Sequence, residues 1–203
     1  MITTELRWFY SGSLPMAVKN WFIAIRDQLV TPGEAREDRY LQLSGCDFLN
    51  LKLRHGNLEL KLRLKQLSKL QVGDRWIGQV EVWQKWSLED FPGHLNLVDS
   101  DLEGAWISVR KVRSQQQYQT FLDQPPQAVS LEQQPNQGCR VELTELQVQE
   151  AVWWSLAFEA FGDPDQQFNQ LQAVAEQISD PLAPILDWQH SYAYPKWLLN
   201  FNY

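Results

Sequence analysis

A two-residue alternation between residues 49 and 65 constrains the fold more than any other feature of this sequence. Leucine occupies almost every second position there, and the positions between are nearly all charged. A period of two is typical of β-strands, whose successive side chains point to opposite faces. A turn-forming His-Gly-Asn sequence at 55–57 interrupts the alternation, so we predict a hairpin of two antiparallel strands, 49–54 and 58–65. One face of this hairpin is leucine and the other is charged.

The rest of the chain contains further strand patterns and two helical ones. We expect additional strands at residues 3–9, 75–86, 105–113, 128–131, 140–146 and 152–160. Apolar residues at helical spacing predict helices near 16–30 and 164–179. The Gln- and Pro-rich stretch 114–137 is otherwise interpreted as a loop. Many strands with two separated helices indicate an α+β fold, and so large a sheet favours closure. We therefore predict an antiparallel β-barrel, or a strongly curled sheet, with flanking helices.

Length and composition fit one folded domain. The 203 residues are 44% hydrophobic and 21% charged, enough to bury a core without disulfides or metals. We expect a single domain spanning 1–203, with the aromatic tail 180–203 packed on its body. No apolar run approaches the roughly 18 residues of a membrane helix, and the N-terminus is already charged. We expect a cytoplasmic protein without membrane association.

Several common site types are disfavoured by the sequence. The two cysteines and three histidines have no metal-ligand or redox spacing, and neither a Gly-rich phosphate loop nor a nucleophile–base arrangement is evident. The net charge of −7 at pH 7 argues against broad nucleic-acid binding, which depends on neutralising phosphates. All of the acidic excess lies in residues 140–203.

The direction of the charged hairpin face decides what the protein can do. In one interpretation the charges face water and the leucines form the core, as is common in antiparallel sheets. In the other, the charges line a barrel and the leucines lie outside, under the helices. Other strands carry charges at matching alternate positions, namely Glu5 and Arg7, Glu81 and Lys85, and Arg140 and Glu142. Mixed cations and carboxylates are the chemistry of a metal-assisted phosphate site.

The order of these features resembles the CYTH superfamily, the triphosphate tunnel enzymes. Members of that family begin with a Glu-x-Glu-x-Lys strand and continue through an Asp-x-Tyr-Leu-like segment to a basic hairpin. They end with a glutamate-bearing strand before a closing helix. The similar segments here are Thr3-Thr4-Glu5-Leu6-Arg7, Asp38-Arg39-Tyr40-Leu41, the basic hairpin, Val109-Arg110-Lys111-Val112-Arg113 and residues 155–162. The resemblance rests on order and pattern over most of 3–179.

The resemblance implies a charged tunnel that binds a triphosphate-containing small molecule and hydrolyses it slowly, if at all. It implies phosphate-binding roles for Arg7, Lys52, Arg54, Lys61, Arg63 and Arg110. It also implies a divalent cation, Mg²⁺ or Mn²⁺, held by Glu5, Glu81, Glu142 and Glu159. Thr3 and Arg7 stand where the family has its first glutamate and its lysine. Because threonine cannot replace a carboxylate, we expect the general base to be missing or weak.

Other functions fit the same residues. A noncatalytic barrel that binds an apolar or aromatic small molecule is favoured by the ten tryptophans and the altered opening motif. A protein-interaction domain that uses the acidic last third is a third possibility. Charged pairs such as Glu5 and Arg7 can also be plain cross-strand ion pairs. The barrel interior discriminates between these hypotheses, because inward charges support a phosphate ligand and inward Trp and Leu support an apolar one.

Overall fold

The computed structural model describes residues 1–25, 33–89 and 106–201 of the 203-residue chain. The strands are β1 (Ile2–Ser11), β2 (Glu34–Leu41), β3 (Leu49–Arg54), β4 (Asn57–Val72), β5 (Trp76–Leu88), β6 (Trp106–Gln119), β7 (Gln127–Val129), β8 (Gly138–Val148) and β9 (Ala151–Phe161). The helices are α1 (Met16–Ile25), α3 (Gln167–Ile178), the 3₁₀ helix η2 (Trp188–His190) and α4 (Tyr194–Leu198).

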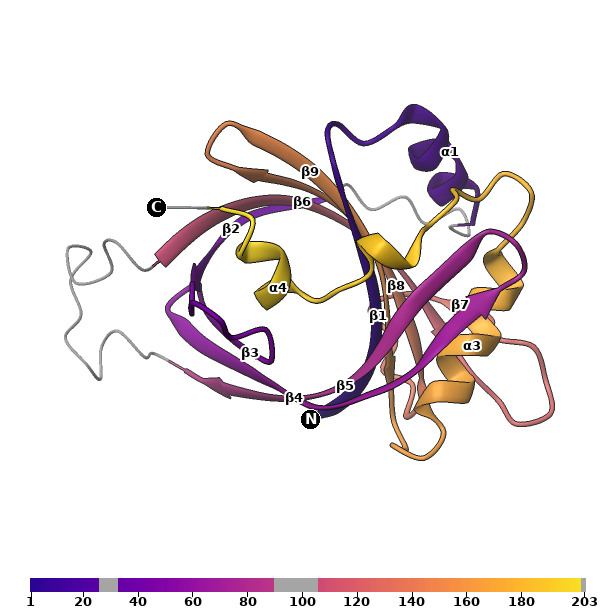
Figure 1. Ribbon diagram of the computed structural model, residues 1–203. Coiled ribbons are helices and arrows are strands. Elements are labelled where there is room, and N and C mark those ends of the chain that lie inside the picture. Colours follow the sequence, from indigo (N-terminus) through magenta and orange to yellow (C-terminus); the bar gives the residue numbers. More distant parts are fainter. Residues whose placement is uncertain (26–32, 90–105, 202–203) are drawn as a thin grey trace.

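Eight of these strands close into an antiparallel barrel (Figure 1). They follow the order β2-β3-β4-β5-β1-β9-β8-β6, and pairing of β2 with β6 completes the circle. The short β7 pairs with the far end of β6. Closure gives each of the eight barrel strands a partner on both sides, whereas β7 pairs with β6 alone. Unpaired edges are the main liability of a large antiparallel sheet. The predicted α+β barrel with flanking helices is therefore confirmed, and none of the described helices is long and apolar enough to cross a membrane.

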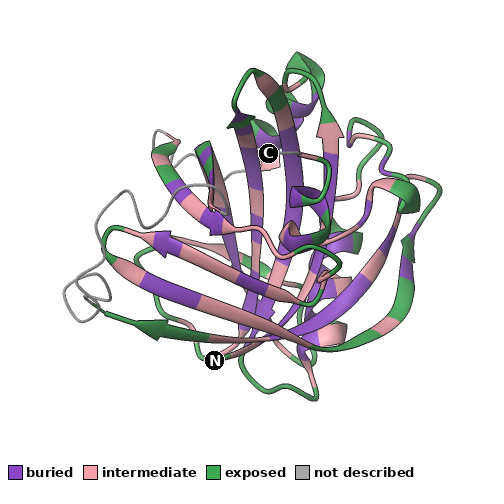
Figure 2. Cartoon of the chain, turned by 60° about the vertical axis from the view of Figure 1, so that its left-hand side comes forward, coloured by how far each residue is buried: buried purple, intermediate pink, exposed green. Residues whose placement is uncertain are grey.

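The main hydrophobic core lies outside the barrel wall rather than within it. Leu6 and Trp8 point outward from β1 and are buried with Trp21 of α1 and Leu171 of α3. Helix α3 contacts β1, β8, β9 and part of β4. Buried residues therefore run along the middle of the strands, and exposed residues gather at hairpin ends (Figure 2).

Two sequence expectations about this wall were wrong. The hairpin leucines do face outward, but the helices cover a different part of the barrel. As a result, Leu51 and Leu62 are half-buried and Leu64 is exposed. The expected loop at 114–137 begins only after Gln119, because the glutamine run continues β6. Glutamine is uncharged and long enough to reach hydrogen-bond partners from a strand, so its presence does not end one.

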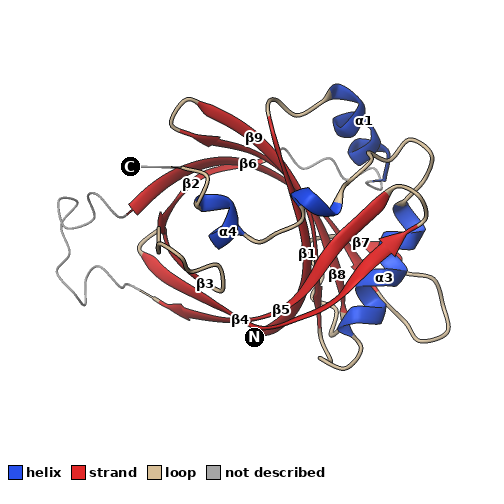
Figure 3. Ribbon diagram, viewed as in Figure 1, coloured by secondary structure: helices blue, strands red, loops and turns tan. Residues whose placement is uncertain are grey.

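The inward face of the barrel changes character along its axis. At one end it is apolar, where Phe9, Val109 and Leu146 form a second core. The C-terminal segment completes this core from inside the ring of strands (Figure 3). Trp197 of α4 stacks on Phe9 with ring centroids 4.9 Å apart. The tail thus fills one end of the barrel.

Candidate functional site

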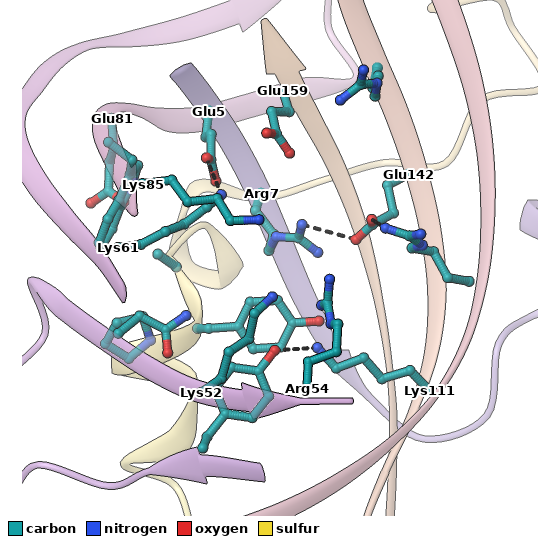
Figure 4. Close-up of a pocket in the computed structure, with 18 of the residues that line it drawn as sticks. Glu5, Arg7, Lys52, Arg54, Lys61, Glu81, Lys85, Lys111, Glu142 and Glu159 are labelled. Carbon is teal, nitrogen blue, oxygen red and sulfur yellow. Dashed lines mark hydrogen bonds and ion pairs between the residues drawn. The ribbon is translucent and has the colours of Figure 1, made fainter. Parts of the chain in front are cut away.

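The remaining part of the barrel interior is a charged cavity of about 330 Å³. Among the described residues its lining includes nine basic side chains, namely Arg7, Arg36, Lys52, Arg54, Lys61, Lys85, Lys111, Arg113 and Arg140. Four acidic side chains also line it, namely Glu5, Glu81, Glu142 and Glu159. Half of the 18 lysines and arginines of an acidic chain therefore meet in one cavity. The charged hairpin face points inward, as the second interpretation predicted (Figure 4).

Strand register places three glutamates side by side in the cavity wall. Glu5 on β1 lies directly opposite Glu81 on β5 and Glu159 on β9. Like charges opposite one another are destabilising, and Lys61 offsets them, with its Nζ 2.6 Å from Glu5 Oε1. Burial opposes the charge of Lys61, but Glu159 and Glu5 outweigh it and raise the lysine's pKa. The same ammonium lowers the pKa of Glu5 against the effect of burial.

Glu81 is fully engaged by its neighbours. Arg63 and Gln66 donate to its Oε1 at 3.0 and 3.1 Å, and Trp83 Nε1 donates to Oε2 at 3.1 Å. Burial raises the pKa of this carboxyl. Arg63 also pairs with Asp47 at 2.9 Å. Glu81 and Arg63 therefore satisfy each other in the wall.

Glu142 is the counter-ion of two arginines. Arg7 Nη2 lies 3.0 Å from its Oε1, and Arg113 Nη1 lies 3.5 Å from its Oε2. Gln115 and Thr144 donate to the same carboxylate. Although burial acts in the opposite direction, these two arginines hold its pKa well below the usual range. Glu142 is therefore ionised, and its role is to orient Arg7 and Arg113.

Asp38 organises the opposite side of the cavity. Its carboxylate is fully buried on β2 and accepts two hydrogen bonds from Arg54, at 2.8 and 2.9 Å. Lys111 Nζ lies 3.1 Å away, and Arg36 Nε lies 3.6 Å away. Burial lowers the pKa of Lys111 to about 7, and Asp38 acts against this effect. In the sequence, Asp38 stands out only as the first residue of the Asp-x-Tyr-Leu-like segment, and nothing there indicates this role.

Glu59 holds a further pair of lysines. Lys52 Nζ and Lys85 Nζ lie 2.8 and 2.9 Å from its Oε2. Burial opposes ionisation of Glu59, but these lysines lower its pKa to about 2. Burial also lowers the pKa of Lys52 well below its ordinary value. The alternating pattern of the hairpin placed Glu59 on the charged face, but it did not show which cations the glutamate would join.

The six residues that the family resemblance assigned to phosphate binding do not all lie in the cavity. Arg7, Lys52, Arg54 and Lys61 line the cavity. Arg63 lies in the wall, held by Glu81. Arg110 lies on the outer surface, where it is 73% exposed and pairs with Glu37. Because β6 alternates, its inward cations are Lys111 and Arg113. Arg110 is therefore corrected to an outer-face residue, and Lys111 and Arg113 of the same strand line the cavity instead.

The family resemblance also implied that the four cavity glutamates hold a divalent metal ion. The described part of the chain contains no group of three or more His, Cys, Asp or Glu residues arranged to hold a metal ion. Glu81 and Glu142 are occupied by cations of the protein. Glu159 is different, since it is half-buried, lines the cavity and makes no hydrogen bond or ion pair with a described side chain. Its carboxylate points into the cavity near Glu5 (Figure 4).

Comparisons with known proteins give weak overall similarity to several solved structures. No family model matches this sequence, and no curated protein matches it. A conserved hypothetical protein from Pyrococcus furiosus is 12% identical with a TM-score of 0.44, over 96% of this chain and 98% of that one. The Mimivirus capping enzyme triphosphatase is 10% identical with a TM-score of 0.44, over 88% and 90%.

A third solved structure, a putative adenylate cyclase from Bacillus halodurans, is 9% identical with a TM-score of 0.41, over 87% of this chain and 91% of that one. At such low identity these matches do not indicate what this chain binds. The function is therefore argued from the cavity.

Proposed function

We propose that this protein binds a triphosphate-like anion inside its barrel, either inorganic triphosphate or the triphosphate tail of a small molecule. The observation that carries the proposal is the convergence of nine cations on one cavity in a chain of net charge −7. The apolar inward positions, which would suit the alternative apolar ligand, are already covered by the C-terminal segment. An anion is therefore the ligand that the available surface favours.

The charge balance of the cavity supports an anion with several negative charges. The nine lining cations face four lining glutamates, with Asp38 and Glu59 bonded behind them. Glu34 also pairs with Arg36 and Arg113. The nine basic residues still outnumber these seven carboxylates, although burial lowers the pKa of Lys52 and Lys111. Arginine forks and lysine ammonium groups make charge-assisted hydrogen bonds to phosphate oxygens. Such contacts are stronger in a poorly solvated interior than in bulk water.

A divalent cation, Mg²⁺ or Mn²⁺, is proposed to enter together with the anion. Mg²⁺ is commonly held by one or two carboxylates plus phosphate oxygens rather than by a complete protein cage. Glu159 has the free carboxylate for this role, and Glu5 lies directly opposite it. The cation would supply further neutralisation of phosphate charge. Glu81 and Glu142 are left out, because both oxygens of each are already bonded within the protein, whereas the bonds of Glu5 to Thr3 and Lys61 both fall on Oε1.

Binding is proposed as the main property, with slow turnover at most. Thr3 donates a 2.7 Å hydrogen bond from Oγ1 to Glu5 Oε1. The position of the absent carboxylate thus holds a hydroxyl that orients Glu5 and cannot accept a proton from water at neutral pH. What the cavity offers a transferring phosphoryl group is electrostatic stabilisation by fixed cations.

The test is calorimetric titration with tripolyphosphate, with and without Mg²⁺, beside a phosphate-release assay. We expect a saturable heat that increases in affinity with Mg²⁺, and little phosphate release. The matched control is Arg110→Ala, which removes an arginine from the outer surface and leaves the cavity intact. No heat at millimolar tripolyphosphate would contradict the proposal, and heat with an apolar ligand instead would favour the alternative.

A further inference from the structure

The C-terminal segment forms part of the cavity wall. Tyr192, Ala193, Tyr194 and Pro195 all line the cavity. The ring of Tyr194 lies 4.9 Å from the Arg7 guanidinium carbon and 4.0 Å from Lys111 Nζ. It also stacks on Tyr40, with ring centroids 5.2 Å apart and planes 7° apart. One aromatic ring thus contacts two of the cavity's cations, which come from β1 and β6.

The position of this ring is fixed from both sides along the chain. Before it, Tyr192 N and Ser191 Oγ donate to the Arg7 carbonyl at 3.1 and 3.0 Å. After it, Trp197 stacks on Phe9. Gln42 Nε2 donates to the carbonyls of Leu198 and Phe201, at 2.9 and 2.7 Å. The ring is therefore presented by an anchored segment, as a positioning group must be.

An aromatic ring holds a cation without cancelling its charge. Its negative face attracts an ammonium or guanidinium group, whereas a carboxylate would neutralise it. Arg7 already has Glu142 as its counter-ion, and Lys111 has Asp38. The Tyr194 ring contacts both cations in addition to these counter-ions. It leaves their positive charge available to a bound anion.

We infer that Tyr194 is a positioning residue, which holds Arg7 and Lys111 together at the inner end of the anion site. The C-terminal segment is then a component of that site, in addition to filling the end of the barrel. This inference rests on the proposed anion-binding function. It assigns a role at the site to a residue of the aromatic tail, for which the sequence predicted packing on the body alone.

The test weakens the electrostatic attraction of the ring face for cations while keeping the ring nearly the same size. Tyr194 is replaced by phenylalanine and then by phenylalanines with one, two and three ring fluorines, which weaken cation binding stepwise. Tripolyphosphate affinity is measured by calorimetry and melting temperature by scanning calorimetry. We expect Tyr194→Phe to bind within about twofold of the natural protein, because the ring carries the role. Each added fluorine should then weaken binding, to about tenfold overall, with melting temperatures nearly unchanged.

The matched control is Trp188, which makes a cation–π contact outside the cavity. Lys69 Nζ lies 3.3 Å from the centroid of its ring. Trp188→Leu should leave the affinity unchanged, and Tyr194→Leu should weaken it at least tenfold. A flat fluorination series, or an equal loss in Tyr194→Phe and Tyr194→Leu, would overturn the inference. Absence of binding by the natural protein would instead overturn the proposed function, so the two failures are distinguishable.

Discussion

Asp38 is the residue whose neutralisation tests the charge arrangement of the barrel most severely. Its buried carboxylate is bonded to Arg54 and Lys111 and lies near Arg36. The change Asp38→Asn keeps the shape of the side chain and removes its charge. The buried cations around it are then left without their shared counter-ion.

The expected cost follows from this burial. Removing one partner of a buried ion pair destabilises a protein by about 3–5 kcal/mol. In a protein of about 200 residues, 1 kcal/mol corresponds to about 2–4 °C in melting temperature, so we expect a fall of about 6–20 °C. Asp47→Asn is the matched control, because Asp47 also pairs with an arginine but is 41% exposed. Exposed pairs contribute about 0–1 kcal/mol.

A bound anion should restore part of this loss. Arg54 and Lys111 line the cavity, so tripolyphosphate can supply the negative charge that Asp38→Asn removes. Scanning calorimetry with and without tripolyphosphate should show a larger upward shift for Asp38→Asn than for the natural protein. The reasoning is refuted if Asp38→Asn is no less stable than Asp47→Asn, or if the anion stabilises it no more than it stabilises the natural protein.

Three other predictions concern single side chains of the cavity. Lys61→Ala should weaken tripolyphosphate binding by about 1.5–3 kcal/mol, the contribution of a charge-assisted hydrogen bond, while Arg110→Ala leaves the calorimetric affinity unchanged. Glu159→Gln should abolish the strengthening by Mg²⁺ and preserve metal-free binding; a retained Mg²⁺ effect would refute its role. Because burial lowers the pKa of Lys111 to about 7, this lysine is charged below pH 7 and neutral above it. Anion affinity should therefore rise as pH falls from 8 to 6, and Lys111→Arg should remove that step, with Asp38, Glu142 and Arg36 as its charged neighbours.

The strands and the separation of charged from apolar faces were predictable because both follow from a period of two. The alternation in residues 49–65 separates leucine from charge over two whole strands. Matching alternation at Glu5 and Arg7 places a third strand on the same surface. Alternation alone allows these charges to face either water or the barrel interior, and the choice of the interior rested on the family resemblance.

The details that failed depend on information that alternation does not contain. A strand's pattern does not say which of its faces is inside, so Arg110 was chosen where Lys111 points inward. Val109 and Lys111, both buried, share the inner face of β6. The sequence predicted that the tail packs on the body but not where, because Tyr194 contacts Arg7 and Tyr40, and Trp197 contacts Phe9, all more than a hundred residues away. The aromatic composition of the tail was visible in the sequence. The apolar surface that it covers, formed by Phe9, Val109 and Leu146 from three strands, exists only after the barrel closes.

A crystal structure with tripolyphosphate is the decisive test of whether the charged interior of this barrel is an anion site. We expect phosphate density inside the barrel, with oxygens within hydrogen-bond distance of Arg7, Lys61 and Lys111. Density on the outer surface with an empty cavity, or an apolar molecule in the cavity, would contradict it.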